Sequence, residues 1–194
     1  STASVTLAVG ANPGGGTISG TLTVAAVAGV ATFPGVSIDK AGVGYTLAAS
    51  SAGLAGAASA AFAITPAAPA ALAFGQQPTD VAADAAITPT VTVRVLDAFG
   101  NLTASTANVT VAIGTNPTAG TLSGTPTVAS VAGVATFSNL SLDKVGTGYT
   151  LTAASGALTA ATSAAFNVTS GAPAKLVFLQ GPTNVAAGQP IAPA

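Results

Sequence analysis

The sequence contains no cysteine, histidine, methionine or tryptophan, and all five of its acidic residues are aspartates. The lack of cysteine excludes disulfide bonds, and the lack of both cysteine and histidine excludes thiolate and imidazole metal sites. General acid–base catalysis needs a second titrating group beside a carboxylate. The two closest acids, Asp80 and Asp84, fall in an expected loop without a second pair. We therefore expect no enzymatic activity, no cofactor and no metal ion.

Charged side chains are also scarce. They make up 5% of the chain, with a net charge of −1, against roughly 25% in ordinary globular domains. Four cations give no electrostatic basis for binding nucleic acid. No apolar run approaches the roughly 18–20 residues of a membrane-spanning helix. We therefore expect no nucleic-acid partner and no membrane span.

An internal repeat organises the chain. The stretch Val134 to Ala153 (VATFSNLSLDKVGTGYTLTA) repeats the stretch Val30 to Ala49 (VATFPGVSIDKAGVGYTLAA) at an offset of 104 positions. At this offset residues 1–90 align with residues 105–194 without a gap, and 54 of the 90 pairs are identical. Because about 100–150 residues is the commonest domain size, this period indicates tandem domains.

Short strands separated by turn signals account for most of one repeat. Apolar residues alternate with other residues in 5–9, 91–96 and 109–113, which is typical of half-buried strands. Further strands are expected at residues 30–33, 71–74, 134–142, 149–153 and 166–168, with Phe137 and Leu140 in the core. Seven to nine strands in about 100 residues predict an all-β fold made of antiparallel β-sandwiches.

The alanine-rich stretches 52–61 and 156–165 leave a helix open on propensity alone. Gly53, Gly56 and Gly156 argue against a helix there, as do the strands expected on both sides.

Each copy of the organising stretch places an aspartate and two glycines before a tyrosine that opens a strand. The residues are Asp39 and Tyr45 in the first copy and Asp143 and Tyr149 in the second. This pattern resembles the tyrosine corner of immunoglobulin-like (Ig-like) sandwiches, in which the tyrosine hydroxyl hydrogen-bonds the backbone of the preceding loop. Two residues later antibody domains have a cysteine, whereas this chain has Leu47 and Leu151, so aliphatic packing would replace the disulfide.

The whole repeat is similar to the bacterial Ig-like domains of the invasin/intimin type. The residues that carry the similarity are Val91–Asn101 (VTVRVLDAFGN), Gly133–Phe137 (GVATF) and Gly146–Leu151 (GTGYTL). The resemblance implies the C-terminal part of one Ig-like repeat in residues 1–67, a complete repeat in 68–171, and the first strand or strands of the next repeat in 172–194. The short proline-containing junctions at 66–69 and 170–173 favour semi-rigid joints.

The same family resemblance implies an extracellular, cell-surface location and a structural role. The chain would be part of a bacterial fibre, stalk or sheath, with copies of itself or adjacent repeats as its partners. The alternative is a cell-adhesion module whose loops bind a glycan or a host surface protein. The loops offer Phe99 and little else for such binding, so the structural role is favoured.

Four asparagines begin an Asn-x-Ser/Thr triplet and are candidate glycosylation sites: Asn101, Asn108, Asn139 and Asn167. Such triplets arise by chance in a threonine-rich chain. However, a nearly uncharged surface with a mean hydropathy of +0.69 would need a cover of glycans or neighbouring molecules to stay soluble. Glycans are therefore a second class of expected partner.

The aspartates are best explained as turn residues, because the aspartate side chain bonds its own backbone. Two alternatives have less support. A calcium site would need several carboxylates in one place, and an isopeptide cross-link would need Lys40 or Lys144 to be buried beside an acid.

The limits of the sequence fall inside repeats. Residues 1–67 lack equivalents of residues 70–104, and residues 174–194 resume a repeat and stop before the equivalent of Val91–Val95. No signal peptide is visible at Ser1. The favoured interpretation is a window onto a longer tandem array. The alternative is donor-strand exchange, in which residues 174–194 of one molecule complete residues 1–67 of the next.

Overall fold

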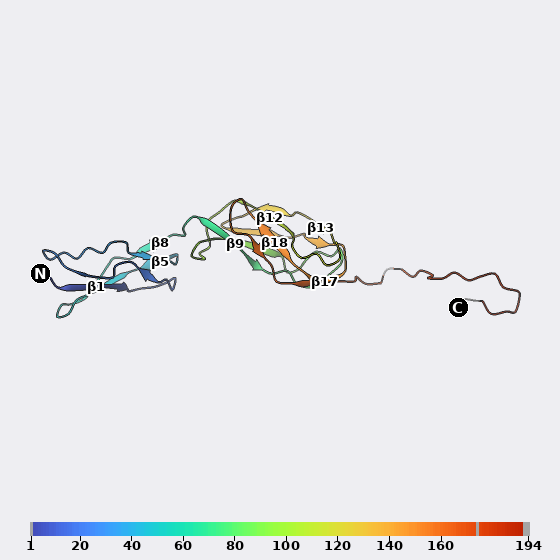
Figure 1. Ribbon diagram of the computed structural model, residues 1–194, viewed down its shortest axis with the longest axis horizontal. Helices are drawn as coiled ribbons and strands as arrows, with labels where there is room; N and C mark the ends of the chain where they lie inside the picture. The colour runs from blue at the N-terminus through green and yellow to red at the C-terminus, as the bar shows by residue number, and fades with distance from the viewer. Residues whose placement is uncertain (1, 174, 192–194) are drawn as a thin grey trace.

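The computed structural model describes residues 2–173 and 175–191. In these ranges the chain is all-β, with twenty strands and no helix. The strands form two groups, one in residues 4–64 and one in residues 69–169, and no sheet contains strands of both groups. Figure 1 shows the two groups one after the other along the long axis of the molecule, followed by the extended residues 175–191.

The second group is an Ig-like β-sandwich. Eight of its twelve strands have three residues or more, in agreement with the predicted seven to nine. The strands are β9 (Pro69–Gln76), β10 (Val81–Ala82), β11 (Val91–Asp97), β12 (Asn108–Ile113), β13 (Leu122–Ser123), β14 (Thr127–Ala129), β15 (Val134–Phe137), β16 (Ser141–Leu142), β17 (Gly146–Tyr149), β18 (Leu151–Ala154), β19 (Ala161–Thr162) and β20 (Phe166–Thr169).

Two antiparallel sheets enclose the core of this sandwich. One sheet has the order β15-β11-β9 and the other has the order β14-β12-β18-β19. A third sheet, β10-β20-β17, contains one parallel pair, β10 with β20. Every second residue of a strand faces inward, and the facing side chains of the sheets form one buried cluster. The predicted core residues Phe137 and Leu140 both belong to it.

Strand β11 lies at the centre of its sheet and carries the most regular pattern. Val91, Val93 and Val95 are fully buried, whereas Arg94 between them is exposed. Burying a valine side chain stabilises a fold by roughly 1.5–3 kcal/mol. These three valines are therefore a substantial part of a core that contains no tryptophan and few aromatic residues.

The first group has the same strands without the β9, β10, β11 and β15 equivalents. Each strand begins 104 positions before a strand of the second group. The strands are β1 (Ser4–Val9), β2 (Ile18–Ser19), β3 (Thr23–Ala25), β4 (Ser37–Ile38), β5 (Gly42–Tyr45), β6 (Leu47–Ser50), β7 (Ala57–Ala58) and β8 (Phe62–Ile64). Its largest sheet has the order β3-β1-β6-β7, and among the described residues no equivalent of the sheet β15-β11-β9 accompanies it.

The open face of the first group is visible in the burial of equivalent residues. Leu151, Phe166 and Val168 are buried in the second group, at 2% exposure or less. The equivalent residues Leu47, Phe62 and Ile64 are only half-buried in the first group.

Two expected strands are not formed. Residues 31–33 lie outside the strands, although the equivalent β15 is a strand. The reason is pairing, because β15 pairs with β11 and the first group contains no β11 equivalent. The first strand expected within residues 172–194 is likewise absent from the described residues 175–191, because β9 pairs mainly with β11. Residues 174 and 192–194 lie outside the described ranges. The helix alternative is excluded, since the two alanine-rich stretches contain β7 and β19.

The glycine that precedes β15 provides a test of the sandwich packing. Gly133 has a φ of +80°, and a Cβ at this position would lie 2.0 Å from the Thr103 carbonyl oxygen. Its equivalent Gly29 has a φ of +88° with nothing within 4 Å. We expect Gly29→Ala to cost about 1–2 kcal/mol for the left-handed backbone, and Gly133→Ala to cost a further ~2 kcal/mol for the clash. Hydrogen exchange of residues 27–30 and of β15 measures the two effects separately. Equal costs would contradict the close packing at Gly133.

Candidate functional site: the joint between the two groups of strands

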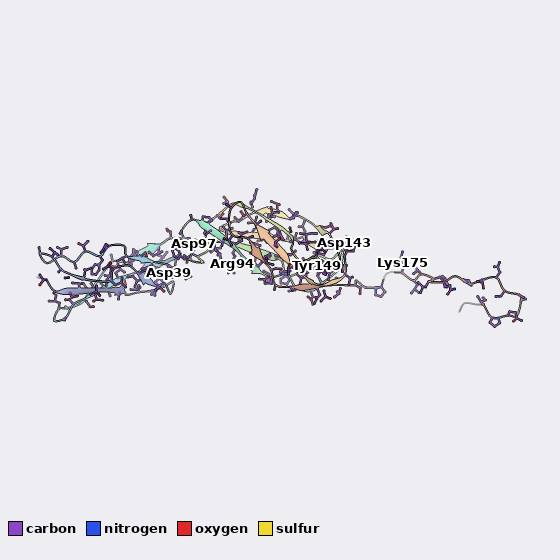
Figure 2. All side chains as sticks on the ribbon, viewed as in Figure 1. Asp39, Arg94, Asp97, Asp143, Tyr149 and Lys175 are labelled. Carbon is purple, nitrogen blue, oxygen red and sulfur yellow. The ribbon has the colours of Figure 1, made fainter. Side chains whose placement is uncertain are left out.

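Three chain segments meet where the two groups of strands join. They are the loop Asp39–Ala41 that follows β4, the linker around Ala67, and the turn Asp97–Asn101 that follows β11. We call these three segments the joint. Figure 2 shows Asp39 and Asp97 close to the narrow region between the two groups.

Asp97 is the central acceptor of the joint. It is the last residue of β11, and it is only 2% exposed. Its Oδ1 accepts hydrogen bonds from the backbone N–H groups of Phe99 and Asn101, both at 2.9 Å. Its Oδ2 accepts from the Ala67 N–H and from the Asn101 Nδ2, also at 2.9 Å. One carboxylate therefore shapes its own turn and fixes the linker.

These contacts control the protonation of Asp97. Burial alone raises the pKa of a carboxyl group, because it removes water from the charged form. Here the hydrogen bonds from the Asn101 side chain and from the backbone of Ala67, Asn101 and Phe99 outweigh burial, and they lower the pKa of Asp97 from 3.8 to about 2. The carboxylate is therefore charged at neutral pH, as the geometry requires.

Asn101 connects the turn to the first group. Its Nδ2 donates to the Asp39 carbonyl oxygen at 2.9 Å as well as to Asp97. Its Oδ1 accepts from the Ala41 N–H at 3.0 Å. Both polar atoms of this amide are therefore used in the joint.

Lys40 supplies the third contact between the groups. Its Nζ donates to the Phe99 carbonyl oxygen at 2.5 Å. A charged donor on a carbonyl makes a stronger hydrogen bond than a neutral pair.

Tyr45 holds the loop that makes these contacts. The tyrosine is fully buried, and its hydroxyl donates to the Lys40 carbonyl oxygen at 2.9 Å. Its ring packs against Phe62 with a centroid distance of 6.2 Å. Asp39 Oδ1 accepts from the Thr17 N–H at 2.6 Å, which fixes the start of the loop. The assignment of Tyr45 to a tyrosine corner stays a prediction, and this hydrogen bond favours it.

The same loop recurs at the far end of the second group. Tyr149 is fully buried and donates to the Lys144 carbonyl oxygen at 3.0 Å, and Asp143 Oδ1 accepts from the Thr121 N–H at 2.6 Å. The Thr121 hydrogen bond lowers the pKa of Asp143, against the effect of burial and with a further contribution from Lys144. Figure 2 places Asp143 and Tyr149 toward the end of the second group from which residues 175–191 extend. The loop surface of the joint is therefore present twice, 104 positions apart.

One difference separates the two tyrosines. The Tyr149 hydroxyl has a second partner, the Thr118 Oγ1 at 2.6 Å. The residue equivalent to Thr118 in the first group is Gly14, whose missing Cβ leaves room for the Tyr45 hydroxyl.

The four candidate glycosylation asparagines differ in their contacts. A glycan on the Asn101 Nδ2 would have to replace hydrogen bonds of the joint, so a structural role is favoured for Asn101. The Asn139 Nδ2 donates to Thr125 Oγ1, and the Asn167 Nδ2 donates to Asp80 Oδ2. Asn108 is exposed at the start of β12, and it stays the best placed of the four.

Among the described residues, no three aspartates lie close enough to hold a metal ion. In the same part of the chain, no helix has the length and apolar character needed to cross a membrane.

The sequence indicated the tyrosine loops but not the role of Asp97 and Asn101. Both belong to the stretch that carries the family resemblance, but the sequence identifies Asp97 only as a turn residue and Asn101 only as a candidate glycosylation site. One feature of the sequence could have indicated their role, namely a polar turn directly after the most regular buried strand. Such a turn must lie at an end of the sandwich, where a neighbouring group of strands can contact it.

No protein-family model and no curated protein matches the sequence. A β-glycosidase from Bacteroides vulgatus is similar over 85% of this chain, with a TM-score of 0.43 and 13% identity; the chain spans only 21% of that protein's length. The D0–D1 domain of intimin is similar over 87% of this chain and 82% of its own, with a TM-score of 0.37 and 18% identity. The Ig-like assignment rests on the strands and core described above.

Asp97 should give the joint a pH dependence of known sign. Because the folded pKa of about 2 lies below 3.8, the stabilisation by Asp97 is fully present above about pH 5 and is lost as the pH falls through 2. A pH titration of the Ala67, Phe99 and Asn101 amide resonances by NMR should therefore show a shared midpoint near 2. In Asp97→Asn the three amides should not titrate together. A wild-type midpoint near 3.8 would contradict the hydrogen-bond network.

The two tyrosine hydroxyls should contribute unequally to stability. Tyr45→Phe removes one hydrogen bond, with an expected cost of about 1 kcal/mol. Tyr149→Phe removes the same bond and the Thr118 contact, so we expect a further ~1 kcal/mol. Hydrogen exchange of residues 42–50 and 146–154 measures each effect in its own group. Introducing Thr118→Gly should make the two costs equal, and a persistent difference would show that the Thr118 contact is not its cause.

Proposed function

We propose that this chain is a structural segment of an extracellular bacterial fibre, stalk or sheath built from tandem Ig-like domains. We place the repeat boundaries as predicted: part of one repeat in residues 1–67, a complete repeat in 68–171 and the start of another in 172–194. The repeats act as spacers, and their partners are adjacent repeats or further copies of the chain. No catalytic role is proposed, because the chain has no histidine, cysteine or glutamate.

The observation that carries this proposal is the joint. Asp97 holds the linker, and Asn101 and the Phe99 carbonyl hold the preceding loop, so four side-chain hydrogen bonds restrict bending. In a flexible tether, these polar groups would form hydrogen bonds with water instead of with each other. A fixed joint between successive domains is the property that a fibre or stalk requires.

Two further observations support the proposal. The loop Asp39–Ala41 of the joint is repeated at Asp143–Val145 with the same tyrosine hydrogen bond. A following repeat can therefore dock in the same way. In addition, sparse charge means little repulsion between adjacent repeats. The adhesin alternative has less support, because the exposed Phe99 belongs to the turn that contacts Lys40.

The stiffness of a tandem array tests the proposal. We would insert one, two and four further copies of residues 70–173 after Pro173 and measure particle lengths by electron microscopy and small-angle X-ray scattering. The expected result is a constant increment of length for each copy. Asn101→Ala in every copy should make the particles bend, whereas Asn108→Ala, the same change at an exposed site, should leave them straight.

Particles that are randomly bent with the wild-type sequence would contradict the structural role. Saturable, sugar-specific binding on a glycan array would instead favour the adhesin alternative. Immunogold labelling of intact cells checks the proposed surface location.

A further inference from the structure

The turn between β14 and β15 ends in an exposed apolar tip, which consists of Val131 and Ala132. Val131 and Val134 exchange two backbone hydrogen bonds, of 2.8 and 3.0 Å, around Ala132 and Gly133. Both central residues have a positive φ, of +48° and +80°. Two-residue turns of this kind favour asparagine, aspartate or glycine at the first position, because a left-handed backbone is unfavourable for alanine. Since Val131 is 76% exposed, the turn keeps an unfavourable alanine and presents an apolar tip.

The same tip occurs in the first group of strands. There Val27 and Val30 exchange the equivalent hydrogen bonds, of 2.8 and 3.0 Å, and Ala28 has a φ of +52°. Val27 is 77% exposed, against 76% for Val131. The exposure of the tip is therefore the same with and without a β11 strand, which makes it a property of the repeat.

In the second group the tip is held firmly against residues 103–105. The Gly133 N–H donates to the Ser105 carbonyl oxygen at 2.9 Å. The Ser130 Oγ donates to the same oxygen at 2.8 Å, and Ser130 is only 1% exposed. A rigid element loses little conformational entropy on binding, so the tip is preorganised for contact with another molecule.

Residues 103–105 also form one wall of a recess at the joint, with a volume of about 470 Å³. The other wall is formed by the linker residues Thr65, Pro66, Ala67 and Pro69. No charged or aromatic residue lines this recess. The Thr103 hydroxyl donates to the Val95 carbonyl oxygen, and the Ala67 N–H donates to Asp97. Because these polar groups already have partners, the recess suits an apolar occupant.

A complete preceding repeat would leave the linker side of this recess open. In the second group, the pairing of β10 with β20 ends where Ala82 lies opposite Thr169. Thr169 is the equivalent of Thr65. The strand equivalent to β10 in the preceding repeat would therefore reach Thr65 and not the linker residues 66–69.

We propose that the tip of one copy of this chain enters the recess of a second copy, and that the recess of the first copy receives the tip of the second. Tip and recess adjoin each other through residues 103–105, so one twofold axis between the copies makes both contacts at once. The two copies then lie side by side and touch at their joints. This contact depends on the proposed function and extends it, because it joins neighbouring fibres laterally.

A second copy of the chain fits these features better than a glycan does. The tip and the recess are both uncharged, whereas a sugar would need free hydrogen-bonding groups or an aromatic surface. The tip also recurs after 104 residues, so a partner that engages several tips must have the same period. Another copy of the chain has this period by definition, and contacts repeated along two arrays add to their avidity.

Sedimentation velocity of the full chain over a range of concentrations tests the association. We expect concentration-dependent dimers for the wild type. Val131→Lys and Ala104→Glu should each weaken dimerisation at least about tenfold, because each buries an unpaired charge. Val131 and Ala104 are exposed, so both variants keep the sandwich. Val43→Lys is the matched control, since Val43 is 82% exposed and lies outside the tip and the recess.

A mixture of the two variants tests whether the tip pairs with the recess. In a mixed dimer of Val131→Lys with Ala104→Glu, the introduced lysine lies against the introduced glutamate, and the other tip and recess are unchanged. Each variant alone should be monomeric where the wild type is half dimeric, whereas the equimolar mixture should regain dimers. Salt at about 1 M should weaken the mixed dimer more than the wild-type dimer, because it screens the new ion pair.

The proposal is supported if both variants lose dimers, Val43→Lys keeps them and the mixture regains them. A wild-type chain that is monomeric at all concentrations overturns it, while straight tandem arrays would still support the structural role. Dimers that persist in Val131→Lys and Ala104→Glu, or that are lost equally in Val43→Lys, overturn the tip and the recess as the contact. A mixture that stays monomeric overturns their pairing. Saturable sugar binding that Ala104→Glu abolishes overturns the second copy as the occupant.

Discussion

The rest of the structure depends on one constraint, namely that strand β11 is buried and paired on both sides. With β11 present, its three valines pack between the sheets and its backbone pairs with β9 and β15. Where the equivalent strand is absent, the same sequence as β15 forms no strand, and the equivalents of buried leucine, phenylalanine and valine residues are half-buried. The chain thus contains the same sequence pattern in two structural contexts, with and without a β11 strand. The difference follows from non-local pairing, which outweighs the local strand propensity.

The C-terminal end of β11 links the core to the joint. Asp97 is both the last residue of the strand and the acceptor for the linker and the turn. The position of the linker is therefore set by the strand that the core fixes most firmly. On the other side, Tyr45 connects the core of the first group to its loop through one hydroxyl. The relative orientation of the two groups of strands therefore follows from buried residues, although the contacts themselves are polar and lie near the surface.

The fold could be predicted from the sequence because its signals are local and repeated. The alternating valines predict strands β11 and β12, and the period of 104 predicts that the two groups have equivalent strands. Gly53 and Gly156 argue correctly against helices in the alanine-rich stretches. The joint could not be predicted in the same way. Asp97 and Asn101 each resemble ordinary turn residues. The partners of Asn101, Asp39 and Ala41, lie about sixty positions away, and the linker partner of Asp97, Ala67, lies 30 positions away. The loss of the strand at residues 31–33 was missed for a similar reason, since its partner strand is non-local.

The path of the chain through the second group has a mechanical consequence. The chain enters through β9 beside the linker and leaves through β20 at the opposite end (Figure 1). Tension along the long axis would pull β9 along β11 and β20 along β17, parallel to the strands. The backbone hydrogen bonds between each pair of strands would then be loaded together in shear instead of breaking one at a time. A domain connected in this way resists stretching far better than one whose ends leave from the same side.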